Sequence, residues 1–163
     1  MISKSRGFTL IEILIVIGII AILASIVIIA INPAKQFAQA RNSQRIANMN
    51  AILNAVGQRM ADNKGIFEGS FTIDGTTYDC GDIDDTATST ISTDEGTNSG
   101  EFGCLVPTYI PALPFDPADE VAATDDTEYD VRILSNGRLR ICAPNGNLED
   151  AIPDPKPENC VTR

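Results

Sequence analysis

The feature that most constrains this chain is a run of 24 residues, 8–31, in which Glu12 is the only charged residue. As an α-helix the run would extend about 36 Å, which is enough to cross a hydrocarbon core of ~30 Å with some tilt. A carboxylate inside hydrocarbon costs roughly 2.5–3.5 kcal/mol on insertion scales. The run therefore predicts a membrane-spanning helix, and Glu12 needs a reason beyond membrane anchoring.

The charges that flank the run predict its orientation. Lys4 and Arg6 precede it, and the next basic residue is Lys35. The positive-inside rule then keeps the N-terminus in the cytoplasm and sends the rest of the chain outward. A secretory signal peptide is the competing interpretation, but its apolar region runs only about 7–15 residues before a small-residue cleavage site. The run is longer and ends in a poor site, Ala30-Ile31-Asn32, so an uncleaved signal anchor is the remaining alternative.

The sequence Arg6-Gly7-Phe8-Thr9-Leu10-Ile11-Glu12 closely resembles the processing site of type IV pilins and pseudopilins. These proteins are the subunits of bacterial pili, type II secretion pseudopili and competence filaments. The shared pattern is a short basic leader, Gly, Phe, a Glu at the fifth mature position and a long apolar run. The resemblance implies that a prepilin peptidase cuts after Gly7 on the cytoplasmic side and that the new amine of Phe8 is N-methylated.

The resemblance also implies a role for Glu12 in assembly. Cleavage would expose the Phe8 α-amine, which is mostly cationic at neutral pH. When subunits stack with an axial offset, Glu12 of one subunit could neutralise the Phe8 amine of another. Such a buried pair mainly sets register, because its desolvation cost offsets much of its attraction. The alternative is that Glu12, near the membrane edge, simply extends its carboxylate to the interface.

The dipeptide Asn32-Pro33 interrupts the apolar run and predicts a kink or a local break. Proline lacks a backbone donor, and its ring clashes with the preceding helical turn. Gly18 is a second possible kink, although a close helix–helix contact would explain this glycine equally well.

After the proline, the chain predicts an amphipathic stem helix that stops near Gly65. Its apolar residues recur at spacings of three and four and form one stripe, with Arg41 and Arg45 off the stripe. We expect the stripe to pack on the sheet of the chain's own head. Its members are Ile46, Met49, Leu53, Val56 and Met60.

The remaining residues predict a small head with an antiparallel sheet. Two runs of alternating residues read as hairpins, 71–78 around Asp74-Gly75 and 129–141 around Asn136-Gly137. Residues 81–103 predict an irregular loop, and the proline-rich tail after Cys142 predicts an extended loop. The expected fold class is α+β and pilin-like: a long N-terminal helix, half membrane-spanning and half amphipathic, packed on a small antiparallel sheet.

Four cysteines, Cys80, Cys104, Cys142 and Cys160, all lie in the head and allow three disulfide pairings. An even number behind a membrane segment indicates disulfides and an oxidising compartment, with four reduced thiols as the alternative. We favour Cys80–Cys104 and Cys142–Cys160, because each closes a loop that has no strong secondary-structure signal. The chain has no His and no C-x-x-C spacing, which argues against zinc.

Charge is distributed unevenly along the chain. Residues 35–64 carry a net charge of +4, and residues 65–163 carry −15. An acidic head repels phosphates, so we expect no nucleic-acid surface there.

The sequence contains no motif that indicates an enzyme: there is no His, no G-x-S-x-G and no P-loop. No cofactor is predicted, apart from a structural calcium ion. The resemblance implies this ion as a candidate, because major pseudopilins carry one in a head loop. Calcium binds six to eight oxygens, which acidic loops can supply, although neither cluster here has EF-hand spacing. The candidate ligands are Asp82, Asp84 and Asp85 in one loop, and Asp125 and Asp126 before the second hairpin.

The expected organisation is a leader peptide at 1–7, a transmembrane and filament-core helix at 8–31, an amphipathic stem at 32–64 and a disulfide-tied head at 65–163. The resemblance implies a filament subunit with an assembly ATPase and a platform protein as partners. The subunit would sit in the cytoplasmic membrane before assembly and at the cell surface afterwards. A pseudopilin of a type II secretion or competence system is one alternative. A monomeric, membrane-anchored extracellular binding protein, uncleaved and without filaments, is the other.

Overall fold

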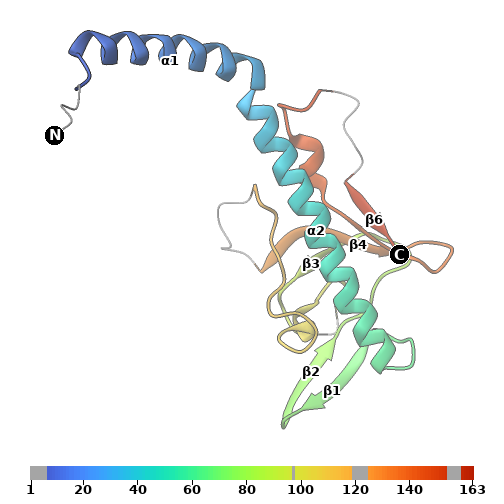
Figure 1. Ribbon diagram of the computed structural model, residues 1–163. Helices are drawn as coiled ribbons and strands as arrows, with labels where there is room; N and C mark the ends of the chain where they lie inside the picture. Colours follow the sequence, from blue (N-terminus) through green and yellow to red (C-terminus); the bar gives the residue numbers. More distant parts are fainter. Residues whose placement is uncertain (1–6, 97, 119–124, 154–158) are drawn as a thin grey trace. The chain divides into compact units, whose positions relative to one another are not determined.

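The computed structural model describes residues 7–96, 98–118, 125–153 and 159–163, with the side chains of 29–31 excepted. The leader before Gly7, and Pro155 and Pro157 of the tail, lie outside the described residues. The chain forms two compact units, one that ends at Phe37 and one that comprises Ala38–Arg163 (Figure 1).

The first unit is dominated by helix α1, Leu10–Ile31. The helix ends at Asn32, which adopts the left-handed conformation (φ 46°) that asparagine tolerates better than most residues. Helix α2 then begins at Pro33, the first helical position, where the missing proline N–H leaves no hydrogen bond unmade. The predicted interruption at Asn32-Pro33 is therefore present, whereas α1 continues through Gly18 without a break.

Helix α2, Pro33–Asp62, buries a broader face than the predicted stripe. Met49, Leu53 and Val56 of that stripe are buried as expected, but Ile46 remains 46% exposed. The buried face includes two arginines, Arg45 and Arg59, and also Ala38, Asn42, Ile52 and Ala55. The apolar spacing predicted the centre of this buried face correctly. It did not include Arg45 and Arg59, which are buried and form hydrogen bonds with other parts of the protein.

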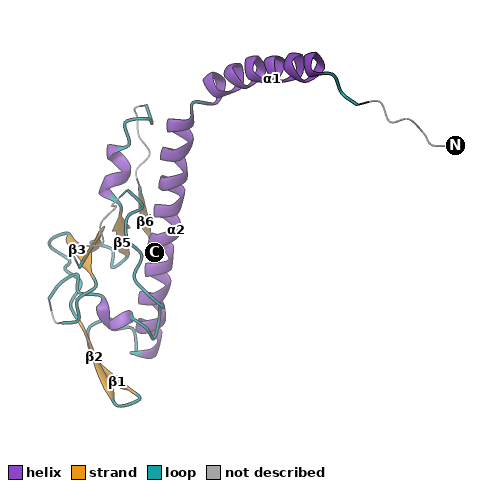
Figure 2. Cartoon of the chain, turned by 90° about the vertical axis from the view of Figure 1, so that its left-hand side faces the viewer, coloured by secondary structure: helices purple, strands orange, loops and turns teal. Residues whose placement is uncertain are grey.

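The head contains a two-stranded and a four-stranded antiparallel sheet. The first is the hairpin of β1 (Gly69–Ile73) and β2 (Thr76–Cys80). The second has the order β3-β4-β5-β6, formed by Ser89–Ser92, Asp126–Ile133, Leu139–Cys142 and Cys160–Thr162. Helix α2 runs along one face of the four-stranded sheet, and the β1–β2 hairpin lies toward the C-terminal end of the helix (Figures 1 and 2). The structure thus has the expected α+β, pilin-like arrangement.

Both predicted hairpins are present, with different turns. Asp74 and Gly75 both have positive φ (51° and 83°), as a two-residue type I′ turn requires. The second hairpin has a wider loop between Ile133 and Leu139, closed by a 2.8 Å hydrogen bond from Leu134 N–H to the Arg138 carbonyl.

Two strands lie where the sequence predicted loops. Strand β3 falls inside the segment expected to be irregular, and β6 falls in the tail expected to be extended. The tail also contains a short 3₁₀ helix, η2, at Pro144–Leu148. Ile91 is the only apolar residue of β3, so local pattern does not reveal this strand, and pairing with β4 stabilises it.

The four cysteines form the two favoured disulfides, Cys80–Cys104 and Cys142–Cys160. The first joins β2 to a 3₁₀ helix, η1 (Gly103–Leu105), inside the hydrophobic core. The second joins the neighbouring strands β5 and β6. The core itself lies between α2 and the sheets and contains Met49, Ile52, Leu53, Val56, Phe102, Leu105, Tyr129, Val131 and Ile141.

Candidate processing and assembly site

The N-terminus of α1 is a capping box formed by Thr9 and Glu12. Glu12 N–H donates to Thr9 Oγ1 at 3.3 Å, and Thr9 N–H donates to Glu12 Oε2 at 3.1 Å. Two of the donors that every helix start leaves unpaired are thereby satisfied within one turn. The carboxylate of Glu12 therefore has a local structural role, which the Thr-x-x-Glu spacing signalled and the sequence interpretation missed.

The rest of α1 is apolar on all sides. Every described side chain from Gly7 to Ile28 is exposed, and Phe8 is 82% exposed. The segment Leu10–Ile28 has a mean hydropathy of 3.1, and none of it is buried. A helix that is apolar all round needs lipid or other helices around it. Its length and composition fit a single membrane span at the N-terminus.

Among the described residues, this end of the chain supplies one carboxylate, that of Glu12. The Phe8 nitrogen is still part of the peptide bond to Gly7, one residue before the N-cap Thr9. Hydrolysis of that bond would create a cation close in sequence to the Glu12 carboxylate. The chemistry that these residues offer is therefore charge pairing.

The aspartates proposed for calcium do not gather into a site. The described residues hold no group of three or more His, Cys, Asp or Glu side chains placed to bind a metal ion. Asp84 Oδ1 instead accepts hydrogen bonds from Thr86 N–H, Thr86 Oγ1 and Ala87 N–H, and these bonds lower the pKa of Asp84. Asp125 Oδ1 accepts from Thr93 Oγ1 at 3.4 Å. Within the part of the chain that the structure describes, these aspartates therefore do not form a set of ligands that fits calcium.

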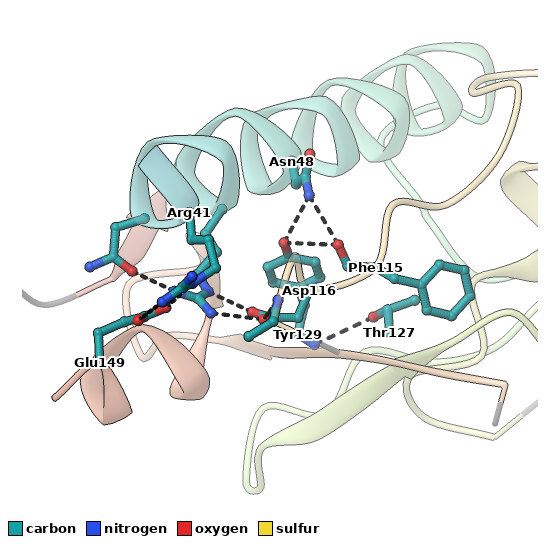
Figure 3. A network of polar contacts seen from close by, with 10 residues as sticks. Arg41, Asn48, Phe115, Asp116, Thr127, Tyr129 and Glu149 are labelled. Atoms are coloured by element: carbon teal, nitrogen blue, oxygen red, sulfur yellow. Dashed lines mark hydrogen bonds and ion pairs between the residues drawn. The ribbon is translucent and has the colours of Figure 1, made fainter. Parts of the chain in front are cut away.

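The structure also reveals a buried ion-pair network that joins α2 to the head and includes Arg41, Asp116 and Glu149 (Figure 3). Its central residue is Arg45, which pairs with both carboxylates. Arg45 is fully buried. Its Nε and Nη2 donate to the two oxygens of Asp116 at 2.6 and 2.8 Å. Its Nη1 donates to Glu149 Oε1 at 2.8 Å and to Asn42 Oδ1 at 2.6 Å. The guanidinium thus binds carboxylates from two separate segments of the head.

Glu149 is shared between two arginines of α2. Both of its oxygens accept hydrogen bonds from Arg41, and Oε1 also accepts from Arg45. The hydrogen bonds from Arg41, assisted by the one from Arg45, lower the pKa of Glu149 to about 2, against the opposing effect of burial. The carboxylate is therefore charged wherever the head is folded near neutral pH.

A second polar contact lies beside this network. Asn48 Nδ2 donates to the hydroxyl of Tyr129 at 2.9 Å and to the Phe115 carbonyl at 3.2 Å (Figure 3). Burial raises the pKa of Tyr129 to about 12. The sequence did not predict the ion pairs of Arg45, because its partners Asp116 and Glu149 lie 71 and 104 residues away. The only local signal was the four-residue spacing of Arg41 and Arg45, which places both on one side of the helix.

The comparison with known families identifies the N-terminal segment. Residues 2–30 match the family model described as the prokaryotic N-terminal methylation motif. This motif is the class III signal peptide of type IV pilins and pseudopilins. The chain therefore carries that signal peptide ahead of a pilin-like α+β arrangement. No curated protein sequence and no solved structure gives a significant match to the chain.

Proposed function

We propose that this protein is a structural subunit of a type IV pilus-like filament. The observation that carries the proposal is the methylation motif at residues 2–30, set on a helix that is apolar on every side. The motif supports a type IV pilin-like or pseudopilin subunit. A buried location for α1 is required by its composition, and a bundle of α1 helices from many subunits would supply one once the helix leaves the membrane.

In this account the precursor is a single-pass membrane protein whose N-terminus faces the cytoplasm. A prepilin peptidase cuts after Gly7, and the new Phe8 amine is methylated. The Glu12 carboxylate of one subunit then pairs with the Phe8 amine of a neighbour. The α1 helices form the filament core, and the acidic heads form its surface. An assembly ATPase and a platform protein in the membrane drive the polymerisation.

The head suits exposure outside the cell. Two disulfides hold its loops, which is typical of proteins in oxidising compartments. The ion pairs of Arg45 fasten the segments that contain Asp116 and Glu149 to α2. Each head would therefore keep its shape while α1 moves from lipid into the filament.

The capping box makes a sharp test of Glu12 possible. Gln at the third helical position supports a capping box as Glu does, but it carries no charge. We therefore expect Glu12→Gln to keep the start of α1 intact and still to abolish surface filaments, and we expect the same loss of filaments from Glu12→Ala. Thr9→Ala is the matched control, because it weakens the cap by about 1 kcal/mol and leaves the charge in place. Filaments are quantified in the sheared fraction, relative to the subunit level in the membrane.

The outcomes separate the alternatives. Normal filaments from Glu12→Gln together with loss in Thr9→Ala would assign Glu12 a capping role and contradict the charge pairing. An uncleaved wild-type protein without filaments would favour a membrane-anchored extracellular binding protein. Filaments confined beneath an outer membrane would favour a secretion or competence pseudopilin.

A further inference from the structure

The disulfide Cys142–Cys160 lies on the outer face of the four-stranded sheet. Side chains alternate between the two faces of a strand. Val131 of β4 and Ile141 of β5 are fully buried in the core. Their neighbours in sequence, Asp130 and Cys142, therefore face the opposite side, and the register places Asp130, Cys142 and Cys160 in one row across β4, β5 and β6. Both cysteines are partly exposed.

A cavity of about 310 Å³ opens on this face, and both cysteines line it. Asp130 and Arg140 line it as well. The cavity is large enough for a small thiol to approach the sulfur atoms. The other disulfide offers no such access, because Cys80 is 3% exposed and Cys104 is fully buried in the hydrophobic core.

The two sulfur atoms of the outer disulfide have different electrostatic surroundings. Arg140 Nη2 donates to Cys160 Sγ at 3.2 Å. The side chain of Asp130, whose Oδ1 accepts from Thr90 Oγ1 at 3.2 Å, is the cross-strand neighbour of Cys142. A guanidinium stabilises a nearby thiolate, and a carboxylate opposes one. Since disulfides exchange faster when the leaving sulfur is the more stable thiolate, Cys160 is the favoured leaving group.

We propose that Cys142–Cys160 is a reactive disulfide, open to an external dithiol, with Cys142 as the sulfur attacked and Cys160 as the leaving group. The incoming thiolate forms a bond to Cys142 Sγ, the Cys142–Cys160 bond breaks, and its electron pair goes to Cys160. The second thiol of the reagent then attacks the mixed disulfide and releases Cys142 as a thiol. The dithiol is oxidised by two electrons to its own disulfide, and the protein gains two thiols.

Reduction would open a closed segment of the head without removing its strands. The disulfide closes a loop whose ends are 18 residues apart. Strands β5 and β6 remain paired through their backbones, with Ile141 opposite Val161. This reaction takes place in the head alone and does not depend on filament assembly.

The test uses the full-length protein in detergent micelles, with dithiothreitol as the probe. Aliquots are quenched with N-ethylmaleimide, and mass spectrometry of peptides gives the rate at which each cysteine becomes labelled. We expect Cys142 and Cys160 to react at least about tenfold faster than Cys80 and Cys104, because a buried disulfide must wait for the core to open. A brief treatment with excess glutathione should leave the mixed disulfide on Cys142 and the free thiol on Cys160.

Two substitutions test the role of Arg140. Arg140→Gln removes the positive charge beside Cys160 and should slow reduction of the outer disulfide about tenfold, the effect of losing one charge-assisted hydrogen bond. Arg138→Gln is the matched control, because the Arg138 guanidinium donates to the Thr162 carbonyl and not to sulfur. Arg138→Gln should leave the rate unchanged.

Equal rates for the two disulfides, or faster labelling of Cys80 and Cys104, would overturn the proposal. Glutathione found on Cys160 would overturn the assignment of the leaving group. An unchanged or faster reaction in Arg140→Gln would overturn the role of Arg140.

Discussion

Arg45 of α2 and Asp116 of the segment that leads to β4 form an ion pair in which both side chains are fully buried. The pair is bidentate, with N–O distances of 2.6 and 2.8 Å. Asp116 Oδ1 also accepts from Ala118 N–H at 2.8 Å. Buried charges are tolerated only while they are paired, so this contact makes the position of α2 on the head sensitive to the loss of either partner.

We expect Arg45→Met to lower the free energy of unfolding by about 3–5 kcal/mol, because it leaves Asp116 buried without its counter-charge. Arg41→Met is the matched control. Arg41 binds the same Glu149 but is 37% exposed, so its loss should cost at most about 1 kcal/mol. Urea unfolding of the full chain in detergent, followed by the near-UV circular dichroism of its tyrosines, measures both. Equal losses of unfolding free energy in the two variants would contradict the claim that burial makes the Arg45 ion pair the more important one.

The low pKa of Glu149 predicts a specific loss of stability in acid. The folded-state pKa of about 2 lies below the ordinary value of 4.5. The stabilisation is therefore complete above about pH 4.5 and is lost as the pH falls toward 2. Glu149→Gln should be less stable than the wild type at pH 7, and this difference should shrink through that window. A difference that stays constant from pH 7 to pH 2 would contradict the account.

The buried hydroxyl of Tyr129 predicts the opposite pH dependence. Its pKa is raised from 10 to about 12, so the folded state favours the neutral phenol. This stabilisation is present below pH 10 and is lost as the pH rises from 10 to 12. Tyr129→Phe should cost about 1 kcal/mol at pH 7, because it removes the hydrogen bond from Asn48. The cost should diminish above pH 10.

A matched control for this change is Tyr78→Phe. The Tyr78 ring stacks on Phe71 in the β1–β2 hairpin, away from Asn48. Urea unfolding of both variants is measured at pH 7 and at pH 11. At pH 7, Tyr78→Phe should lower the free energy of unfolding less than Tyr129→Phe does. If the loss of unfolding free energy from Tyr129→Phe is the same at both pH values, the folded state does not favour the neutral phenol of Tyr129.

Local sequence signals were sufficient for several elements. The apolar run predicted α1, Asn32-Pro33 predicted its end, and Asp74-Gly75 with Asn136-Gly137 predicted two hairpins. Each of these signals lies in or directly beside the element that it predicts. The disulfide pairing also followed from chain position, because each pair closes one loop.

Elements that depend on distant partners were not predictable in this way. Strand β3 has a polar sequence, and it exists because β4 pairs with it. The sequence placed Arg45 off the apolar stripe without a partner, since neither Asp116 nor Glu149 is near it in sequence. The capping box of Thr9 and Glu12 differs, because its Thr-x-x-Glu signal is local, although the sequence prediction assigned Glu12 only to assembly or to the membrane interface.

The most direct test of the central claim is the intact mass of the protein sheared from the surface of producing cells, measured without reduction. The account predicts a chain that begins at Phe8, is heavier by one methyl group and lacks the four hydrogens lost in forming two disulfides. That mass would establish cleavage after Gly7, methylation and release in a surface assembly together. Full-length protein, found only in the membrane fraction and absent from the sheared material, would contradict the claim.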